Sequence, residues 1–127
     1  MEKNSLLEIR KELDILKSQC KPTDTWQSYL DDDDEMGVFY IQEGIDAVAN
    51  VLDQFIQALV DMDDYANCKM VEETIHKLIL DLNNLSHVYE GMIETGEREE
   101  LVDFILSVLD IIEYEYIGDI TEQWREW

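Results

Sequence analysis

The chain has 127 residues, of which 46% are hydrophobic, and its 31 acidic and nine basic side chains give a net charge of −22. A chain of this length buries a core without disulfides or metals, so one folded domain spanning residues 1–127 is expected. No run of about 18 apolar residues occurs, so no membrane-spanning helix is expected.

The N-terminal segment and the two cysteines favour a cytoplasmic protein. Residues 1–19 alternate charged side chains with Leu and Ile, which is typical of an amphipathic helix and not of a secretory signal. Cys20 and Cys68 lie far apart and lack metal-ligand spacing, as expected for reduced thiols.

The negative charge is unevenly distributed along the chain. Residues 1–21 hold five bases and four acids, whereas residues 22–127 hold four bases and 27 acids, a net charge of −23. Such a charge opposes contact with nucleic acid or an anionic membrane and favours a basic partner, whose association it can accelerate. Solubility alone, or a salt-loving host, is the competing explanation.

The first third of the chain predicts a helix, a short turn and an acidic loop. Ser5 and Glu8 form a capping box before an apolar stripe, which predicts a helix over residues 6–19. Pro22 ends it, because the residue before a proline avoids helical angles. A short turn with Trp26 and Tyr29 follows, and then five consecutive carboxylates, which cannot all be buried: Asp31, Asp32, Asp33, Asp34 and Glu35.

Three longer helices are expected after this acidic run. Apolar residues at helical spacing predict one helix from about Met36 to Asp61, and a second stripe runs from Val71 to Tyr89. The last stretch, residues 94–127, begins with Thr95 as a cap and should stay helical until Gly118, before a tail that carries Trp124.

The predicted fold is therefore all-α, an antiparallel bundle of about four helices with a short C-terminal helix. Short connections make consecutive helices antiparallel. The acidic run would then share one end of the bundle with residues 90–100. The opposite end would bring Asp61, Asp63 and Asp64 close to Glu113, Glu115 and Asp119.

Metal and catalytic motifs are incomplete, and we expect no metal, cofactor or enzyme activity. An EF-hand loop starting at Asp32 would place Met36 where calcium needs an oxygen ligand. Glu73 and His76 have the spacing of a di-iron ligand pair, but the second copy is missing because Asn84 stands three residues before His87. No activated cysteine, serine elbow or phosphate loop is present.

The aromatic residues allow two interpretations. Trp26, Tyr29 and Tyr40 flank the acidic run, and Trp124 stands beside Arg125 in the tail. Aromatic residues at helix ends usually cover a core, but where exposed beside acids they serve as interface anchors.

Two C-terminal segments resemble the immunity proteins that accompany bacterial polymorphic toxins, including those of contact-dependent growth inhibition systems. The resemblance covers about the last 35 residues and rests on Ile93-Glu94-Thr95-Gly96-Glu97-Arg98-Glu99-Glu100-Leu101 and Asp119-Ile120-Thr121-Glu122-Gln123-Trp124-Arg125-Glu126-Trp127. It implies a cytoplasmic, non-enzymatic protein that binds one toxin domain and blocks its active site or substrate surface.

The resemblance and the charge together predict an inhibitor of a basic toxin domain, a nuclease, in a one-to-one complex with a monomer. The alternative is a stand-alone acidic adaptor or nucleic-acid mimic that binds a basic host protein. The expected contact residues are the acidic run, a second acidic group and three aromatic anchors: Asp31, Asp32, Asp33, Asp34, Glu35, Glu97, Glu99, Glu100, Tyr29, Tyr40 and Trp124.

Overall fold

The computed structural model describes residues 6–19, 21–31, 40–62, 68–114 and 120–127. These residues form five helices and no strand, which confirms the all-α prediction. The helices are α1 (Leu6–Gln19), α2 (Pro22–Asp31), α3 (Gln42–Val60), α4 (Cys68–Val88) and α5 (Thr95–Ile111).

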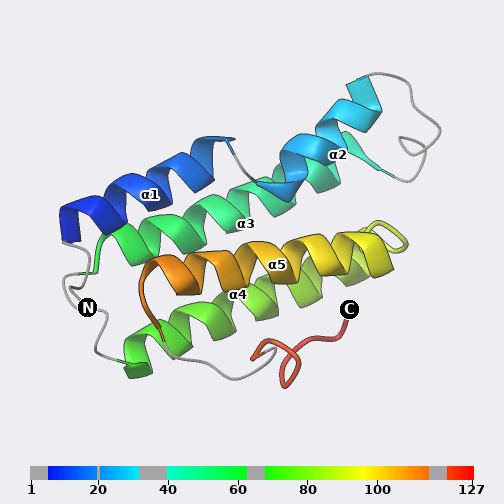
Figure 1. Ribbon diagram of the computed structural model, residues 1–127. Coiled ribbons are helices and arrows are strands. Elements are labelled where there is room, and N and C mark those ends of the chain that lie inside the picture. Colours follow the sequence, from blue (N-terminus) through cyan, green and yellow to red (C-terminus); the bar gives the residue numbers. More distant parts are fainter. Residues whose placement is uncertain (1–5, 20, 32–39, 63–67, 115–119) are drawn as a thin grey trace.

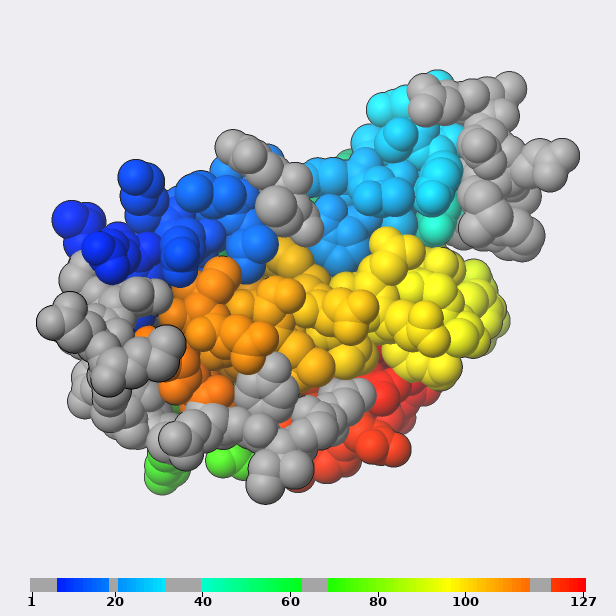
Figure 2. Space-filling model, in the orientation of Figure 1, coloured from blue at the N-terminus to red at the C-terminus, as the bar shows by residue number. Residues whose placement is uncertain are grey.

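The helices form a bundle in which consecutive long helices are antiparallel (Figure 1). α1 and α2 follow each other along one side and pack against both α3 and α5, while α4 packs mainly against α3. As a result, α3 and α5 begin at the same end of the bundle. Figure 2 shows α5 on one face, between α1 and α2 above and the C-terminal tail below.

The core consists of the apolar stripes that the sequence indicates. Leu13, Leu52, Ile75, Leu82 and Ile105 are fully buried, one from α1, one from α3, two from α4 and one from α5. Since most helical stability in proteins comes from packing such faces, these stripes determine where each helix lies.

α1 and α2 are two separate helices that follow each other along the same side of the bundle. The predicted bounds of the first helix, residues 6–19, agree with α1, and Pro22 ends it as expected. Pro22 also opens α2, where the sequence predicted only a turn. Proline suits a first helical position because the N–H that it lacks would have no intrahelical acceptor there.

Two predicted helix limits were wrong. The helix expected from Met36 begins at Gln42, because Ile41 is extended (φ −118°, ψ 129°). The helix expected to reach Gly118 ends at Ile111, and Glu113 adopts the left-handed conformation (φ 60°) that closes its last turn. Gly118 itself lies outside the described residues.

The turns at the other helix ends also refine the prediction. Gly91 has a φ of +83°, which glycine adopts without strain, whereas Gly96 lies inside α5. Glu94, not Thr95, precedes the first residue of α5. In the tail, the backbone N–H groups of Trp124 and Arg125 both donate to the Thr121 carbonyl at 3.0 Å, so the described part of the expected C-terminal helix is a single turn.

Candidate protein-binding surface

Three helix ends meet at one end of the bundle, where α2 finishes and α3 and α5 begin. The side-chain amides of Gln27 and Gln42 exchange two hydrogen bonds, of 2.7 and 2.6 Å, which connect α2 to α3. The indole N–H of Trp26 donates to Oε2 of Glu100 at 3.3 Å and connects α2 to α5. The predicted shared end therefore exists among the described residues.

The turn between α4 and α5 reaches the same end through a close contact with Gly44. A Cβ atom on Gly44 would lie 2.6 Å from the sulfur of Met92 and 3.2 Å from Cγ of Tyr89. A side chain at this position would therefore force the buried end of Met92 to move and would press on the ring of Tyr89. Glycine lets the start of α3 and the α4–α5 turn pack together.

We call this region the acidic end. Its described acidic residues come from the end of α2, the start of α3, the α4–α5 turn and the start of α5: Asp31, Glu43, Asp46, Glu90, Glu94, Glu97, Glu99 and Glu100. Asp32, Asp33, Asp34 and Glu35, the rest of the predicted acidic run, lie outside the described residues, as does most of the candidate calcium loop.

Basic side chains are scarce in the segments that build the acidic end. Residues 22–68 contain twelve acids and no Lys, Arg or His, and residues 78–97 contain four acids and no Lys or Arg. Arg98 follows directly, and it lines a surface hollow together with Glu99, Asp103 and Arg125. Glu99 is thus exposed but has two guanidinium groups in the same hollow.

The opposite end of the bundle uses its bases to stabilise the fold. Nε of Arg10 donates to the carbonyl of Val60 at 2.8 Å, at the C-terminus of α3, where positive charge is favourable. Lys69 stands in the first turn of α4. Nearer the break between α1 and α2, Nζ of Lys21 pairs with Oδ1 of Asp53 at 2.7 Å.

Tyr40 is a core residue, so it does not present the surface anchor that the sequence suggested. It is 5% exposed, and its ring stacks between Trp26 and Tyr29, with centroid distances of 5.7 and 6.2 Å. Burial, and then the negative charges of Glu97 and Glu100, raise the pKa of its phenol well above the ordinary value. Tyr29, at the outer end of this stack, is half-buried.

Two members of the second acidic group have structural contacts. Glu97 is 8% exposed, and its Oε1 accepts the backbone N–H of Glu94 at 3.4 Å, at the start of α5. Glu100 is half-buried; burial raises its pKa, the hydrogen bond from Trp26 lowers it, and the nearby charge of Glu97 raises it further. Both carboxylates therefore lie within the junction of helices, and neither extends fully into solvent.

Trp124 covers α4 at a different place from the acidic end. Its ring stacks on His76 at a centroid distance of 4.5 Å. Nδ2 of the buried Asn83 donates to the Trp124 carbonyl at 2.9 Å, while its Oδ1 accepts the N–H of Glu126 at 2.9 Å. The half-buried Trp124 thus belongs to a tail that is docked on α4, which corresponds to the core-cover interpretation.

No family model, curated protein or solved structure matches this chain. A function for this chain is therefore inferred from its own residues and their geometry. Among the described residues, no group of three or more His, Cys, Asp or Glu side chains is placed to hold a metal ion. In the same part of the chain, no helix has the length and apolar character needed to cross a membrane.

The exposed carboxylates of the acidic end include several that sequence reasoning did not select. Glu43 and Asp46 on the first turns of α3, and Glu90 and Glu94 in the α4–α5 turn, are all exposed. Asp31, at the end of α2, is exposed as well. The absence of bases from residues 22–68 was the available signal for Glu43 and Asp46, and the contact between Gly44 and the α4–α5 turn places the start of α3 beside Glu90 and Glu94.

Proposed function

We propose that this chain is an immunity protein, which binds a cognate basic toxin domain and neutralises it by covering the active site or the substrate-binding surface. The toxin is a nuclease in this proposal, because nucleases hold phosphates in basic clefts that carboxylates can occupy. The complex has one copy of each protein and forms in the cytoplasm.

The observation that carries the proposal is the charge imbalance at the acidic end. Eight described acids stand there against two bases, Arg98 and Arg125, which share a surface hollow with Glu99. Charges of one sign concentrated on one surface steer a partner of the opposite sign and raise association rates by roughly 10–10³-fold. A basic toxin would thus be attracted to a defined end of the bundle.

The rigidity of this end also supports a binding role. The hydrogen bonds from Gln27, Gln42 and Trp26 connect three helices. The amides of Gln27 and Gln42 also donate to Oδ1 of Asp31 and Oδ1 of Asp46, both at 2.9 Å. Because these two carboxylates are held in place before binding, less conformational entropy is lost when a partner contacts them. Asp31, Glu43, Asp46, Glu90 and Glu94 are accordingly the main contact residues in this proposal, with Asp32, Asp33, Asp34 and Glu35 next to them in sequence.

A growth experiment tests the proposal directly. The open reading frame immediately upstream is expressed in a bacterial host with and without this chain. Toxicity that disappears on co-expression is the expected result. A harmless neighbour, or toxicity that the chain does not relieve, would contradict an immunity role.

Binding measurements separate immunity from the alternative of a general acidic adaptor. The purified chain and the upstream protein should form a tight one-to-one complex, with an association rate that falls steeply as salt is raised from about 0.05 to 0.5 M and charges become screened. Equal binding to unrelated basic proteins, such as lysozyme or histones, would instead favour the adaptor.

A further inference from the structure

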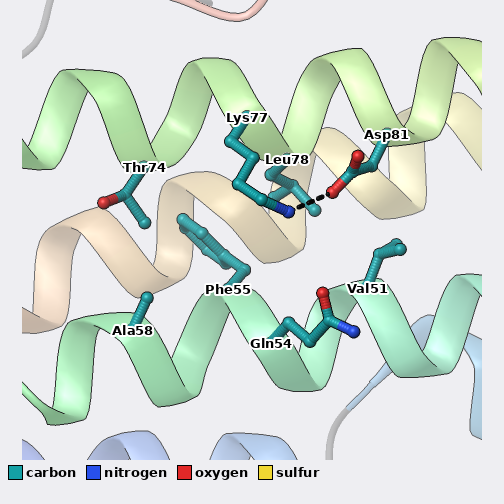
Figure 3. A pocket seen from close by; sticks show the side chains of 8 residues that line it. All are labelled: Val51, Gln54, Phe55, Ala58, Thr74, Lys77, Leu78 and Asp81. Carbon is teal, nitrogen blue, oxygen red and sulfur yellow. Dashed lines mark hydrogen bonds and ion pairs between the residues drawn. The ribbon is translucent and has the colours of Figure 1, made fainter.

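A small apolar pocket opens between α3 and α4, on the side of this helix pair that faces away from α5 (Figure 3). Its volume is about 120 Å³. Four residues of each helix line it: Val51, Gln54, Phe55 and Ala58 of α3, and Thr74, Lys77, Leu78 and Asp81 of α4.

The pocket has an apolar floor and a polar rim. Phe55 and Leu78 are buried, and Val51 is half-buried. At the rim, Nζ of Lys77 pairs with Oδ2 of Asp81 at 2.8 Å (Figure 3). An apolar centre enclosed by polar groups is the arrangement of binding hot spots, where an anchor side chain is buried and water is excluded around it.

Two exposed apolar side chains lie on the same face of α4 as the pocket. Met70 and Val88 are 48% and 60% exposed. Residues 70, 74, 77, 81 and 88 follow the spacing of one helix face, so Met70 and Val88 lie on either side of the polar residues Thr74, Lys77 and Asp81. Val88, the last residue of α4, lies at the acidic end.

The size of the pocket limits what can fill it. A protein cavity of roughly 150 Å³ lined by apolar side chains accommodates benzene. A pocket of about 120 Å³ therefore suits one ring or one branched aliphatic side chain. It is too small for a helix or a cofactor.

The charge of the α3–α4 face indicates which kind of molecule supplies the side chain that fills the pocket. α3 contains three acids and no base, and α4 contains three acids and two bases, one of which, Lys77, is paired within the rim. A second copy of the chain would bring another net charge of −22 against this face. A cationic protein, in contrast, would be attracted by the negative potential of this face.

We propose that the α3–α4 pocket receives one apolar side chain of the same basic partner that contacts the acidic end. This inference rests on the proposed function. The two regions lie within reach of one interface: Glu43 precedes Gln54 by eleven residues, about 16 Å of helix. An interface of ordinary size covers about 800 Å² on each partner, which is enough to include both.

The test uses substitutions that fill the pocket without changing the charge. Ala58→Phe fills it from α3, and Thr74→Leu fills it from α4. Ser107→Phe is the matched control, because Ser107 is exposed on α5, away from the α3–α4 face, and does not line the pocket. All three full-length variants and the wild type are measured by surface plasmon resonance against the purified product of the upstream reading frame, with circular dichroism as a check on folding.

Both filling substitutions should weaken binding at least about tenfold, mainly through faster dissociation, since interface contacts act chiefly on that rate. Ser107→Phe should stay within about twofold of the wild type, a change below 0.5 kcal/mol. A salt-dependent complex that tolerates both filling substitutions would overturn the pocket inference and leave the proposed function intact. Failure of the wild type to bind would overturn the proposed function. It would also overturn the inference that a side chain of this partner fills the pocket.

Discussion

At the end where α1 and α4 begin, acidic and basic side chains are mixed, and Arg10 stabilises the C-terminus of α3. The described charges there are seven acids and three bases: Glu8, Glu12, Asp61, Glu72, Glu73, Asp110 and Glu113, with Arg10, Lys11 and Lys69. The acidic end has eight acids and two bases, Arg98 and Arg125. Both ends close the same helical bundle, so the fold alone does not require this difference.

The comparison also separates acids that are packed into the helix junction from acids that are available to a partner. Glu97 and Glu100 contact the backbone of Glu94 and the indole of Trp26, whereas Glu43 and Glu94 direct exposed carboxylates to solvent. Substitutions can test these two roles separately.

Trp26→Ala should be the most damaging, because it removes a fully buried ring, its stacking on Tyr40 and the hydrogen bond to Glu100. Loss of a buried Trp side chain typically lowers the free energy of unfolding by about 3–5 kcal/mol. Urea denaturation followed by circular dichroism measures the change. A loss below about 1 kcal/mol would show that this ring does not hold the three helices together.

Charge reversal should distinguish the two ends in binding. We expect Asp31→Lys, Glu43→Lys and Glu94→Lys together to slow association with the toxin domain on the order of a hundredfold at low salt, because they remove the steering field. Glu72→Lys, Glu73→Lys and Asp110→Lys change the net charge equally at the opposite end and should have a much smaller effect. Stopped-flow kinetics gives both rates, and equal slowing would mean that only total charge matters.

Gly44→Ala should destabilise the acidic end without altering its charge. The added methyl group would lie 2.6 Å from the sulfur of Met92, and overpacking of this kind lowers the free energy of unfolding by about 1–3 kcal/mol. Gly96→Ala is the control, because no atom lies within 4 Å of its added Cβ. In α5 it should be neutral or stabilising by up to about 1 kcal/mol, since Ala favours helices over Gly. Thermal denaturation of both variants tests this difference.

The smallest effect concerns the pH dependence of stability. Burial raises the pKa of Glu100 above its ordinary value, so the folded state holds this proton more tightly than the unfolded chain. The free energy of unfolding should therefore fall as pH rises through the folded pKa. Glu100→Gln should remove that contribution and be more stable than the wild type at pH 7, with the gain lost below the ordinary Glu pKa of about 4.3.

Glu90→Gln provides the reference for this experiment, because it removes one negative charge from the acidic end at an exposed position. Urea denaturation at several pH values compares the two variants with the wild type. If Glu90→Gln stabilises the protein at pH 7 as much as Glu100→Gln does, general charge repulsion and not burial explains the gain.

The helices could be predicted from the sequence where apolar spacing was long and regular. The stripes of α1 and α4 identify both helices, and Pro22 ends the first. The prediction was wrong at Met36 and Gly118, because the limits of α3 and α5 depend on the backbone angles of Ile41 and Glu113. Apolar periodicity carries no information about such single-residue conformations.

The sequence by itself determined the helical class, the core-facing stripes and the excess of negative charge, because these follow from residue types and their spacing along one chain. Only the tertiary structure decided which acids and aromatics face solvent. Tyr40 and Glu97 are buried because α2, α3 and α5 converge on them, although nothing nearby in the sequence distinguishes them from exposed neighbours. Burial is a property of contacts between distant segments, and so is the surface that a partner would meet.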